Sequence, residues 1–472
     1  MYFFDRTRYV VLVISIICLT LIFSNSIALN FTIICMDDVR LDYYQQSANT
    51  TLQETPHWLE SSSHINALFS AIAVGCLIGT LPGPFLIHKF GVCKAMAVYG
   101  AISALATLAL PIAVHFGFIA VFVMRVLQGS ATGFTFPAMG LIASQWSTTK
   151  GAGTFIALLS CHVQLCSVFT MPVAGALCGS SLGWRAVFYL QGSLSAVAVA
   201  VFVLFYRDDP RLHRNVSAAE LGKVSRGKHT HDQKQPVPYR AIFTDPCIIG
   251  VWLSSVGGSL GFNIFLLYGP TYINKVLRYD VTSTGFAAAV PYVMAAAVKF
   301  MLGPISDRAT CISDRWRLIF FAVISQGVMA IAFLALVFIT DPVMAQIAYT
   351  TTIVSSGINA VGVVKCAQMV ARQHVHIVMS VTSFLMCVVV LVIPVAVNAI
   401  CPDGTPEEWS RLFFGISVVV VAANIPFVFV ARSEPARWTG NKVLSKSSEK
   451  EKEIPEDVHQ TNGISTAKIA WK

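Results

Sequence analysis

The sequence contains few charged residues. Asp, Glu, Lys and Arg make up 12% of its 472 residues, whereas hydrophobic residues make up 55%. Soluble domains carry about 25% charged residues, so this composition excludes an ordinary soluble protein and indicates a membrane-embedded one. The net charge of +9 does not indicate nucleic-acid binding, because the basic residues lie in short segments between apolar runs and in the C-terminal tail.

Several chemical signatures are also absent. No GxxxxGK[ST] sequence occurs, which argues against an ATP-driven pump. No Ser/His/Asp arrangement or metal-ligand spacing points to an enzyme, a metal site or a cofactor. Most of the twelve cysteines lie in apolar runs without CxxC spacing, so we interpret them as small packing residues.

Twelve apolar runs are each long enough to cross a bilayer, which takes about 20 residues. They cover residues 9–35, 66–87, 94–114, 117–143, 152–178, 185–206, 247–273, 284–304, 316–339, 343–364, 376–400 and 410–431. A polar segment with eight basic and five acidic residues, 207–245, separates the first six runs from the last six. We predict an all-α membrane protein with six-helix halves at 1–206 and 246–431, joined by this linker and followed by a disordered tail, 432–472.

The positions of Lys and Arg predict the orientation. With both termini in the cytoplasm, 26 of the 33 basic residues are cytoplasmic, five lie outside and two lie within runs. This orientation places the acidic first loop, about 37–65, outside the cytoplasm, where Asn49 of Asn-Thr-Thr is a candidate for N-glycosylation. The plasma membrane and endolysosomal or vesicular membranes are all compatible with the sequence.

A short motif recurs at corresponding places in the two halves. GPISDR, 303–308, lies at the cytoplasmic end of the eighth run, and its equivalent PGPFLIHKFG, 82–91, lies at the end of the second. An Asp-Arg pair can bond helix ends across a cytoplasmic seam, and a glycine lets the helices approach. The residues of this expected conformational latch are Gly303, Asp307, Arg308, His88 and Lys89. The repeat favours the major facilitator fold, whose halves rock about a midplane site.

Several stretches together resemble a known family. The fourth run carries RVLQGSATGFTFPA, and ALNFTIICM, TMPVAGALCGSSLGWRAVFYLQG, VPYRAIFTDP, LLYGPTYINKVLRYDVTSTGFAAAVPYV and EEWSRLFFGI have matching spacing. They resemble the anion/cation symporters of the major facilitator superfamily, which include type I sodium-phosphate cotransporters, sialin and the vesicular glutamate transporters. The resemblance covers nearly the whole chain. It implies transport of organic anions or phosphate past cationic side chains, with an acidic residue helping to couple protons.

Most of the charged positions that the resemblance implies hold uncharged residues here. The fourth-run arginine is present as Arg125, but the first-run arginine corresponds to Ala28 and the glutamate after LQG to Thr132. The second-run histidine falls near Phe69, and the seventh-run arginine falls near Gly258. No run has Asp or Glu in its interior, so a carboxylate proton relay within the membrane is not available.

Arg125 is the strongest candidate for a binding residue. No acidic residue lies within fifteen positions of it, and an unpaired charge at membrane depth costs roughly 2.5–3.5 kcal/mol on insertion scales. Helical spacing places Gln128, Gly129 and Thr132 on its face, and Gly129 and Gly133 form a GxxxG element for close helix packing. We expect a cavity-facing site that binds an anion in bidentate fashion. The alternative is an arginine that bonds backbone carbonyls and holds the first half together.

Other polar residues within the runs are candidate substrate ligands, and the alternative for each is a helix–helix hydrogen bond. They are Asn30, Asn263, Tyr268, Tyr272 and Asn359. His162 lies about ten residues, or roughly 15 Å, from the predicted cytoplasmic end of its run. Histidine titrates near neutral pH, so His162 is a candidate for proton coupling, with a packing role as the alternative. Lys299 is expected to extend to the cytoplasmic interface and not to bind substrate.

The sequence predicts a monomeric secondary-active transporter of a small organic anion or inorganic phosphate. It would work by alternating access and use a proton or sodium gradient. One alternative is a carrier of neutral or weakly polar solutes, which fits the missing charges. Another is a non-transporting receptor or scaffold with the same fold. The predicted partners are the solute, the coupling ion and the lipid bilayer, without nucleic acid or a cofactor.

Overall fold

The computed structural model describes residues 5–48, 57–148, 151–225, 238–308 and 313–439. Within these ranges, twelve helical segments are long and apolar enough to cross a membrane, and no strand occurs. Each segment corresponds to one of the twelve predicted apolar runs, which are therefore confirmed.

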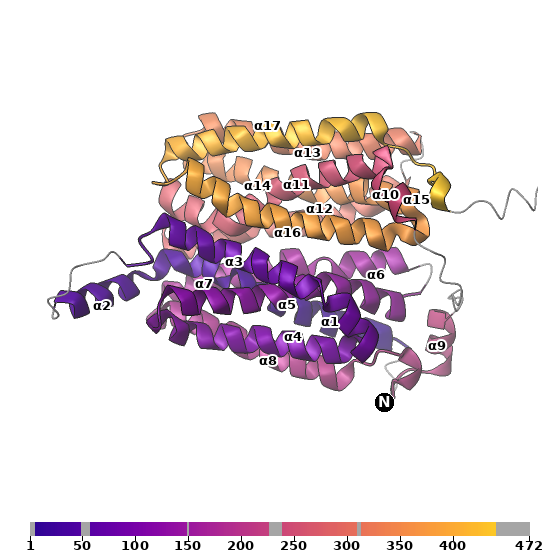
Figure 1. Ribbon diagram of the computed structural model, residues 1–472, viewed down its shortest axis with the longest axis horizontal. Coiled ribbons are helices and arrows are strands. Elements are labelled where there is room, and N and C mark those ends of the chain that lie inside the picture. Colours follow the sequence, from indigo (N-terminus) through magenta and orange to yellow (C-terminus); the bar gives the residue numbers. More distant parts are fainter. Residues whose placement is uncertain (1–4, 49–56, 149–150, 226–237, 309–312, 440–472) are drawn as a thin grey trace, which may run out of the picture.

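The spanning helices form two bundles of six, which Figure 1 shows stacked on one another. The lower bundle contains α1 (Thr7–Thr32), α3 (Ser62–Thr80), α4 (Gly83–His115), α5 (Phe118–Trp146), the consecutive α6 (Ala152–Leu159) and α7 (His162–Cys178), and α8 (Gly183–Phe205). The upper bundle contains α11 (Pro246–Thr271) with η3 (Tyr272–Val276), α12 (Val281–Arg308), α13 (Asp314–Phe338), α14 (Pro342–Asn359) with η4 (Ala360–Val364) and α15 (Lys365–Ala371), α16 (Val375–Ile400) and α17 (Pro406–Val430). Helices α3 and α7 of the first half pack against α16 and α12 of the second.

The two ends of the bundles differ. The linker side, on the right in Figure 1, carries the start of α1 and the short helices η2 (Pro210–Leu212), α9 (Ala218–Ser225) and α10 (Tyr239–Phe243). The opposite end, which we call the far side, carries η1 (Ile33–Cys35) and α2 (Asp37–Ala48). The charge distribution predicts that the linker side faces the cytoplasm.

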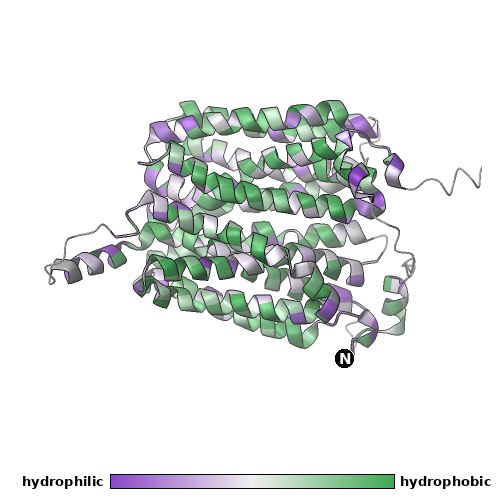
Figure 2. Ribbon diagram, viewed as in Figure 1, coloured by the Kyte–Doolittle hydropathy of each residue, from purple (hydrophilic) through white to green (hydrophobic). Residues whose placement is uncertain are grey.

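Hydrophobic residues occupy most of the length of the helices, while hydrophilic residues gather at both ends of the bundles (Figure 2). Large apolar side chains such as Ile119, Phe338 and Phe429 are each more than 70% exposed. A soluble protein would bury such residues, whereas a membrane protein presents them to lipid chains. The surface therefore suits a bilayer and not water.

Helices α3 and α5 pack backbone against backbone. A Cβ added at Gly129 or Gly133 of α5 would lie only 2.2 and 2.4 Å from a carbonyl oxygen of α3. The same holds in return at Gly75 and Gly79 of α3, where the distances are 2.1 and 2.0 Å to carbonyl oxygens of α5. The predicted GxxxG contact on α5 is confirmed, and its partner is a second GxxxG element.

The first described part of the linker, residues 207–225, packs onto the linker side of the first half. Glu220 of α9 accepts hydrogen bonds from the first two backbone amides of α1. Asp208 accepts bonds of 2.8 and 3.2 Å from the amides of Val92 and Cys93, where α4 resumes after a kink at Gly91. Both carboxylates lie at helix starts, where free amides and the helix dipole favour negative charge.

The start of the predicted disordered tail is ordered, which corrects the sequence prediction. Arg432 pairs with the Asp245 carboxylate at the start of α11, and Trp438 Nε1 donates to the same carboxylate at 2.9 Å. These contacts anchor residues 432–439, which include η6 (Arg437–Thr439). Residues 440–472 lie outside the described residues.

Two cysteines have a covalent role that spacing did not indicate. Cys35 in η1 and Cys178 at the end of α7 form a disulfide on the far side. The interpretation of the cysteines as packing residues is therefore wrong for this pair, because their partners are 143 residues apart and meet only in the fold. Disulfides persist in oxidising compartments, which agrees with a far side that faces away from the cytoplasm.

Candidate functional site

Arg125 is enclosed by α1, α3 and α5, and it is 0% exposed. Its Nε donates to the Leu68 carbonyl at 3.3 Å, and its Nη1 donates to the Ser26 carbonyl at 2.5 Å. Nη1 also donates to Gln128 Oε1 at 3.4 Å, and Nη2 donates to Asn30 Oδ1 at 2.9 Å. Arg125 does not line the far-side cavity described below, and its carbonyl contacts match the alternative of an arginine that holds the first half together, so its role in anion binding stays a prediction.

The charge of Arg125 is not neutralised by these contacts. All four recorded acceptors are carbonyl or amide oxygens, and within the described part of the chain no carboxylate pairs with the guanidinium. Hydrogen bonds to neutral oxygens satisfy the N–H groups but leave a full positive charge in a low-dielectric region. An anion would find both charge and donors there.

The polar contacts continue from Arg125 into the first half. Gln128 Nε2 donates to Thr107 Oγ1 at 2.9 Å, and Thr107 donates to the Ser103 carbonyl at 2.7 Å. Asn25 Nδ2 of α1 donates to Ser103 Oγ at 3.0 Å. This chain of bonds joins α1, α4 and α5, so it fixes the orientation of the Gln128 amide that touches Arg125.

Asn30 connects Arg125 to the second half. Its Oδ1 accepts from Arg125, while its Nδ2 donates to the Leu266 carbonyl of α11 at 3.4 Å. Close by, the Tyr268 hydroxyl of α11 donates to Asn66 Oδ1 of α3 at 2.5 Å. Two hydrogen bonds thus join the halves here, and one of them comes from Asn30, the residue that also accepts a bond from Arg125.

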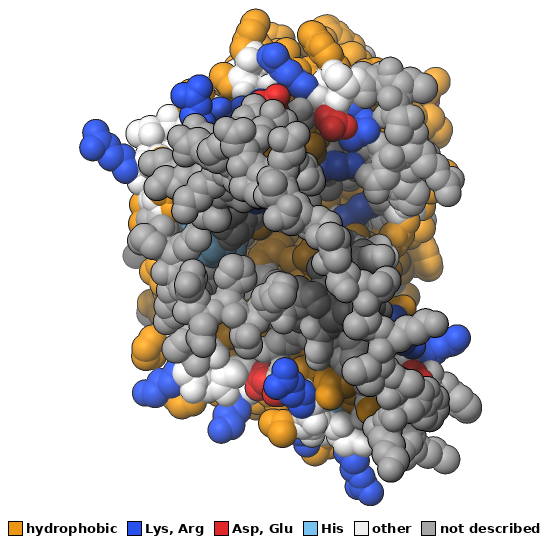
Figure 3. Space-filling view, turned by 90° about the vertical axis from the view of Figure 1, so that its right-hand side faces the viewer, with side chains coloured by type: hydrophobic (Ala, Val, Ile, Leu, Met, Phe, Trp, Pro, Cys, Tyr) orange, Lys and Arg blue, Asp and Glu red, His pale blue; other side chains and the backbone are white. Residues whose placement is uncertain are grey.

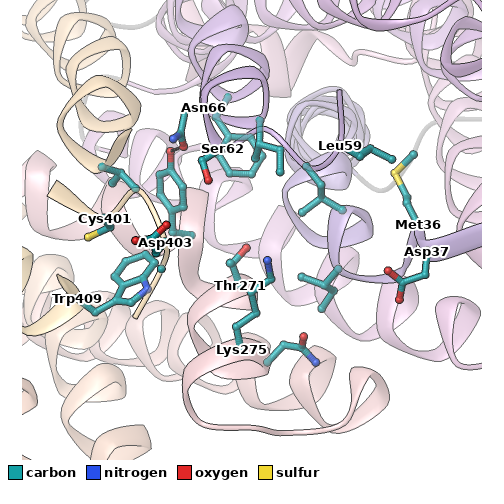
Figure 4. Close-up of a pocket in the computed structure, with 18 of the residues that line it drawn as sticks. Met36, Asp37, Leu59, Ser62, Asn66, Thr271, Lys275, Cys401, Asp403 and Trp409 are labelled. Atoms are coloured by element: carbon teal, nitrogen blue, oxygen red, sulfur yellow. Dashed lines mark hydrogen bonds between the residues drawn. The ribbon is translucent and has the colours of Figure 1, made fainter. Parts of the chain in front are cut away.

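A cavity of about 280 Å³ lies between the far-side ends of the two halves. Its charged lining residues are Asp37, Arg40, Lys275 and Asp403. Figure 4 shows Asp37 and Asp403 on opposite sides of this cavity. Asn66 and Tyr268 also line it, and their hydrogen bond joins the halves along its wall, whereas Arg125 is not a lining residue.

A second polar cluster lies inside the second half. Asn359 of α14 fills the space beside Gly258, because a Cβ at Gly258 would lie 2.5 Å from Asn359 Nδ2. Gln326 Nε2 donates to Ser254 Oγ at 2.6 Å, and Ser254 donates to Asn424 Oδ1 at 2.8 Å. The buried oxygens Asn359 Oδ1 and Gln326 Oε1 have no hydrogen-bond partner. Sequence reasoning missed Gln326 and Asn424, whose only signal was an isolated amide in an apolar run.

The remaining predicted substrate ligands make local contacts. Thr132 Oγ1 donates to the Gln128 carbonyl of its own helix at 3.1 Å. Asn263 Nδ2 donates to the Ser259 carbonyl at 2.8 Å. Tyr272 is buried in an aromatic cluster on the far side. The eight predicted residues therefore divide among several places, and of them Tyr268 lines the far-side cavity.

His162 is packed between aromatic rings at the start of α7. Its ring centroid lies 5.8 Å from that of Phe23 and 5.9 Å from that of Phe136, and it is 0% exposed. Nδ1 lies 2.8 Å from the Leu159 carbonyl, which can only accept, so Nδ1 carries the proton. Nε2 is buried without a partner. The surroundings match the packing alternative, while Nε2 keeps a free lone pair.

Lys299 does not extend to the interface as expected. Its ammonium donates to Ser160 Oγ at 2.7 Å, at the break between α6 and α7. The bond runs from the second half to the first. The sequence indicates how deep Lys299 lies in the membrane but not which residues surround it. Ser160 of the first half supplies a hydrogen-bond acceptor at that depth, so Lys299 need not reach the interface.

The latch prediction concerns the linker-side ends of α4 and α12. The side chains at four of its positions lie outside the described residues, namely His88, Gly303, Asp307 and Arg308. Lys89 is exposed, with its ammonium 5.3 Å from the centroid of the Phe90 ring. Asn49 also lies outside the described residues. The latch and the glycosylation site stay predictions.

The sequence matches the Major Facilitator Superfamily over residues 12–394. The chain belongs to this superfamily. It is a multi-pass membrane transporter and not an enzyme.

Curated relatives confirm the resemblance drawn from the motifs. Human sialin is 24% identical over 78% of this chain and 75% of its own length. Mouse sodium-dependent phosphate transport protein 3 is 22% identical over 80% of each chain. Vesicular glutamate transporter 1 of Xenopus tropicalis is 24% identical over 91% of this chain and 76% of its own length.

Solved structures share the fold. The xylose transporter XylE from E. coli, in a partially occluded inward-open conformation, has a TM-score of 0.66 at 13% identity and covers 89% of this chain and 97% of its own. A bacterial homologue of the lysosomal transporter Spinster has a TM-score of 0.64 at 14% identity, covering 90% and 97%. These likenesses confirm the twelve-helix major facilitator fold.

Proposed function

We propose that this transporter carries a small organic anion or inorganic phosphate by alternating access, driven by a proton or sodium gradient. The observation that supports this most directly is the fully buried Arg125, whose hydrogen bonds all go to neutral oxygens. A bound anion supplies the missing negative charge. Relatives named for the transport of phosphate and glutamate support the same class of solute.

Asn30 links anion binding to the movement of the halves. An anion that bonds Arg125 Nη2 competes with Asn30 Oδ1, and the same Asn30 amide bonds the Leu266 carbonyl of the second half. Displacement of Asn30 therefore weakens a contact that joins the halves. Binding shifts a conformational equilibrium only by such differential contacts.

The polar cluster of the second half suits the uncharged part of the solute. Asn359 Oδ1 and Gln326 Oε1 are buried acceptors without donors, and a solute hydroxyl or amide can bond them. A solute with one acidic group and neighbouring hydroxyl or amide groups fits this distribution. The same cluster favours the second candidate function, a carrier of neutral polar solutes.

The driving ion and the orientation complete the proposal. No Asp or Glu lies inside the predicted runs, so His162 with its unpartnered Nε2 is the candidate proton acceptor. Both termini are proposed to face the cytoplasm, in a plasma, endolysosomal or vesicular membrane.

Uptake into liposomes tests the proposal. The purified protein is reconstituted and offered phosphate, glutamate, sialate, urate and neutral solutes under imposed proton, sodium and voltage gradients. We expect anion uptake that Arg125→Ala abolishes and Arg125→Lys weakens, because an ammonium lacks the bidentate fork of a guanidinium. Arg211→Ala, on the exposed surface of η2, is the matched control and should transport normally.

Folding must be measured beside uptake. Arg125→Ala leaves the Ser26 carbonyl and Asn30 Oδ1 buried without this donor, at a cost of about 1–3 kcal/mol for each group. A melting curve in detergent therefore accompanies each variant. Undiminished anion uptake by folded Arg125→Ala overturns the site. Uptake of neutral solutes alone establishes the second candidate, and binding without uptake establishes a receptor.

A further inference from the structure

The fifth spanning segment is interrupted where Lys299 reaches it. Helix α6 ends at Leu159, α7 begins at His162, and Ser160 lies between them. Ser160 is eight residues beyond the start of α6, which at 1.5 Å per residue is about 12 Å from the linker side. Lys299 lies nine residues before the end of α12, at about the same depth. An ammonium from the second half therefore meets a helix break of the first half inside the membrane-spanning region.

The charge of Lys299 is not neutralised there. Its recorded hydrogen bond goes to the neutral Ser160 hydroxyl, and among the described residues no carboxylate pairs with it. An ammonium has three N–H donors, so two can still bond a ligand. Ser160 Oγ donates its own proton to the Ala157 carbonyl at 2.8 Å, and it can turn that proton to a bound ligand only by giving up this bond.

Two neighbouring features also favour an anion. Helix α7 has seventeen residues, and the positive end of its dipole at His162 is offset only in part by the C-terminal end of the shorter, eight-residue α6. His162 at this N-terminus is 0% exposed and holds Nε2 without a partner, so it favours an anion once Nε2 has taken up the coupled proton and the imidazole is positively charged. A break that presents a helix N-terminus at membrane depth is a recurrent binding feature in secondary transporters.

Lys299 is more accessible than Arg125. Lys299 and Ser160 are half-buried, whereas Arg125 is 0% exposed. The linker face is hollowed at its centre, with hydrophobic side chains inside the hollow (Figure 3). Arg125 lies seven residues, or about 10 Å, from the far-side start of α5. Arg125 thus lies toward the far side and Lys299 toward the linker side.

We infer that Lys299, Ser160 and the N-terminus of α7 form an anion subsite toward the linker side, which binds the carboxylate or phosphate group of the solute. This inference rests on the proposed function, because it names a second binding site for the same transported anion. Arg125 binds the anion toward the far side, and Lys299 binds it before release to, or after capture from, the linker side. Since Lys299 and Ser160 belong to different halves, an anion between them also contacts both halves.

Ligand-dependent melting tests the subsite without relying on transport. The probes are inorganic phosphate, L-glutamate and sialate at 10 mM, with sodium chloride of matched ionic strength and a neutral sugar as controls. We expect at least one probe to raise the melting temperature of the wild type by about 2 °C or more, since a ligand that binds the folded state stabilises it. The shift should persist in Lys299→Arg, fall below one quarter in Lys299→Gln, and decrease in Ser160→Ala.

Controls separate this subsite from the Arg125 site. Arg125→Ala should lose uptake but keep part of the thermal shift, whereas the double variant Arg125→Ala/Lys299→Gln should lose all of it. Lys94→Gln, on the exposed linker-side part of α4, should behave as wild type. The melting temperature of Lys299→Gln without anion reports its folding.

Sided transport gives a second readout. In vesicles of known orientation, Lys299→Gln should raise the KM about tenfold for anion supplied at the linker side, with less than a twofold change for anion supplied at the far side. A wild type that no probe stabilises overturns the subsite. So does a Lys299→Gln variant that keeps the full shift, or one whose KM changes equally on both sides. Loss of uptake in Arg125→Ala with a normal Lys299→Gln supports the proposed function but rejects the subsite.

Discussion

Replacing Gly129 with alanine should separate α5 from α3 and disturb the Arg125 site. The new Cβ would lie 2.2 Å from the Ile72 carbonyl oxygen, about 1.2 Å closer than ordinary van der Waals contact at 3.4 Å. No side chain can move aside, because the obstacle is the backbone of α3. One turn away, the Leu68 carbonyl accepts the 3.3 Å bond from Arg125 Nε, and this bond lengthens when the helices move apart.

The expected magnitude follows from two opposing effects. Overpacking a tight contact costs typically 1–3 kcal/mol, and a backbone obstacle places the cost at the upper end. Alanine in a helix interior gains up to about 1 kcal/mol over glycine. The net loss at Gly129 should therefore be about 2–3 kcal/mol. Gly140 of the same helix has nothing within 4 Å of an added Cβ, so Gly140→Ala should stabilise or leave the stability unchanged.

Thermal unfolding in detergent and uptake in liposomes measure the two variants side by side. Gly129→Ala should melt at a lower temperature than the wild type and transport more slowly, while Gly140→Ala should do neither. Equal melting temperatures and equal uptake for the two variants would refute the reasoning that α3 and α5 meet through their backbones at Gly129.

Two further predictions concern the seam between the halves and the first loop. Cys76 Sγ of α3 and Cys387 Sγ of α16 lie 3.0 Å apart across the seam, so copper phenanthroline should join them and stop transport, with recovery in dithiothreitol and no effect in Cys76→Ala. Cross-linking that leaves uptake intact would show that α3 and α16 need not separate during transport. Asn49 should carry an N-glycan, so endoglycosidase treatment should lower the apparent mass of the wild type but not of Asn49→Gln. A wild type unaffected by the enzyme would place the first loop in the cytoplasm or leave the sequon unused.

Much of the architecture could be predicted because membranes impose local rules. A bilayer requires about 20 consecutive apolar residues per helix, so the twelve runs mark the helices directly. The GxxxG spacing at Gly129 and Gly133 also predicted a close helix contact, since glycines four residues apart share a face. The spacing did not identify the partner helix, because any helix with a complementary surface would satisfy it.

The contacts within the candidate site could not be predicted from such local rules. The sequence by itself determined that Arg125 is a charge at membrane depth without an acidic neighbour in the chain, and that Asn30 and Lys299 lie within spanning runs. Only the tertiary structure decided that Asn30 joins Arg125 to Leu266 of the other half, and that Lys299 turns to Ser160 and not to the interface.

The physical reason is the distance along the chain between the groups that meet. Periodicity assigns a residue to a helix face and to a depth, but its partner depends on which helices pack together and at what rotation. Cys35 and Cys178, 143 residues apart, illustrate this, as does Asn359 in the space left by Gly258. The sequence determined which residues enter the membrane, and the packing of the helices decided which of them touch.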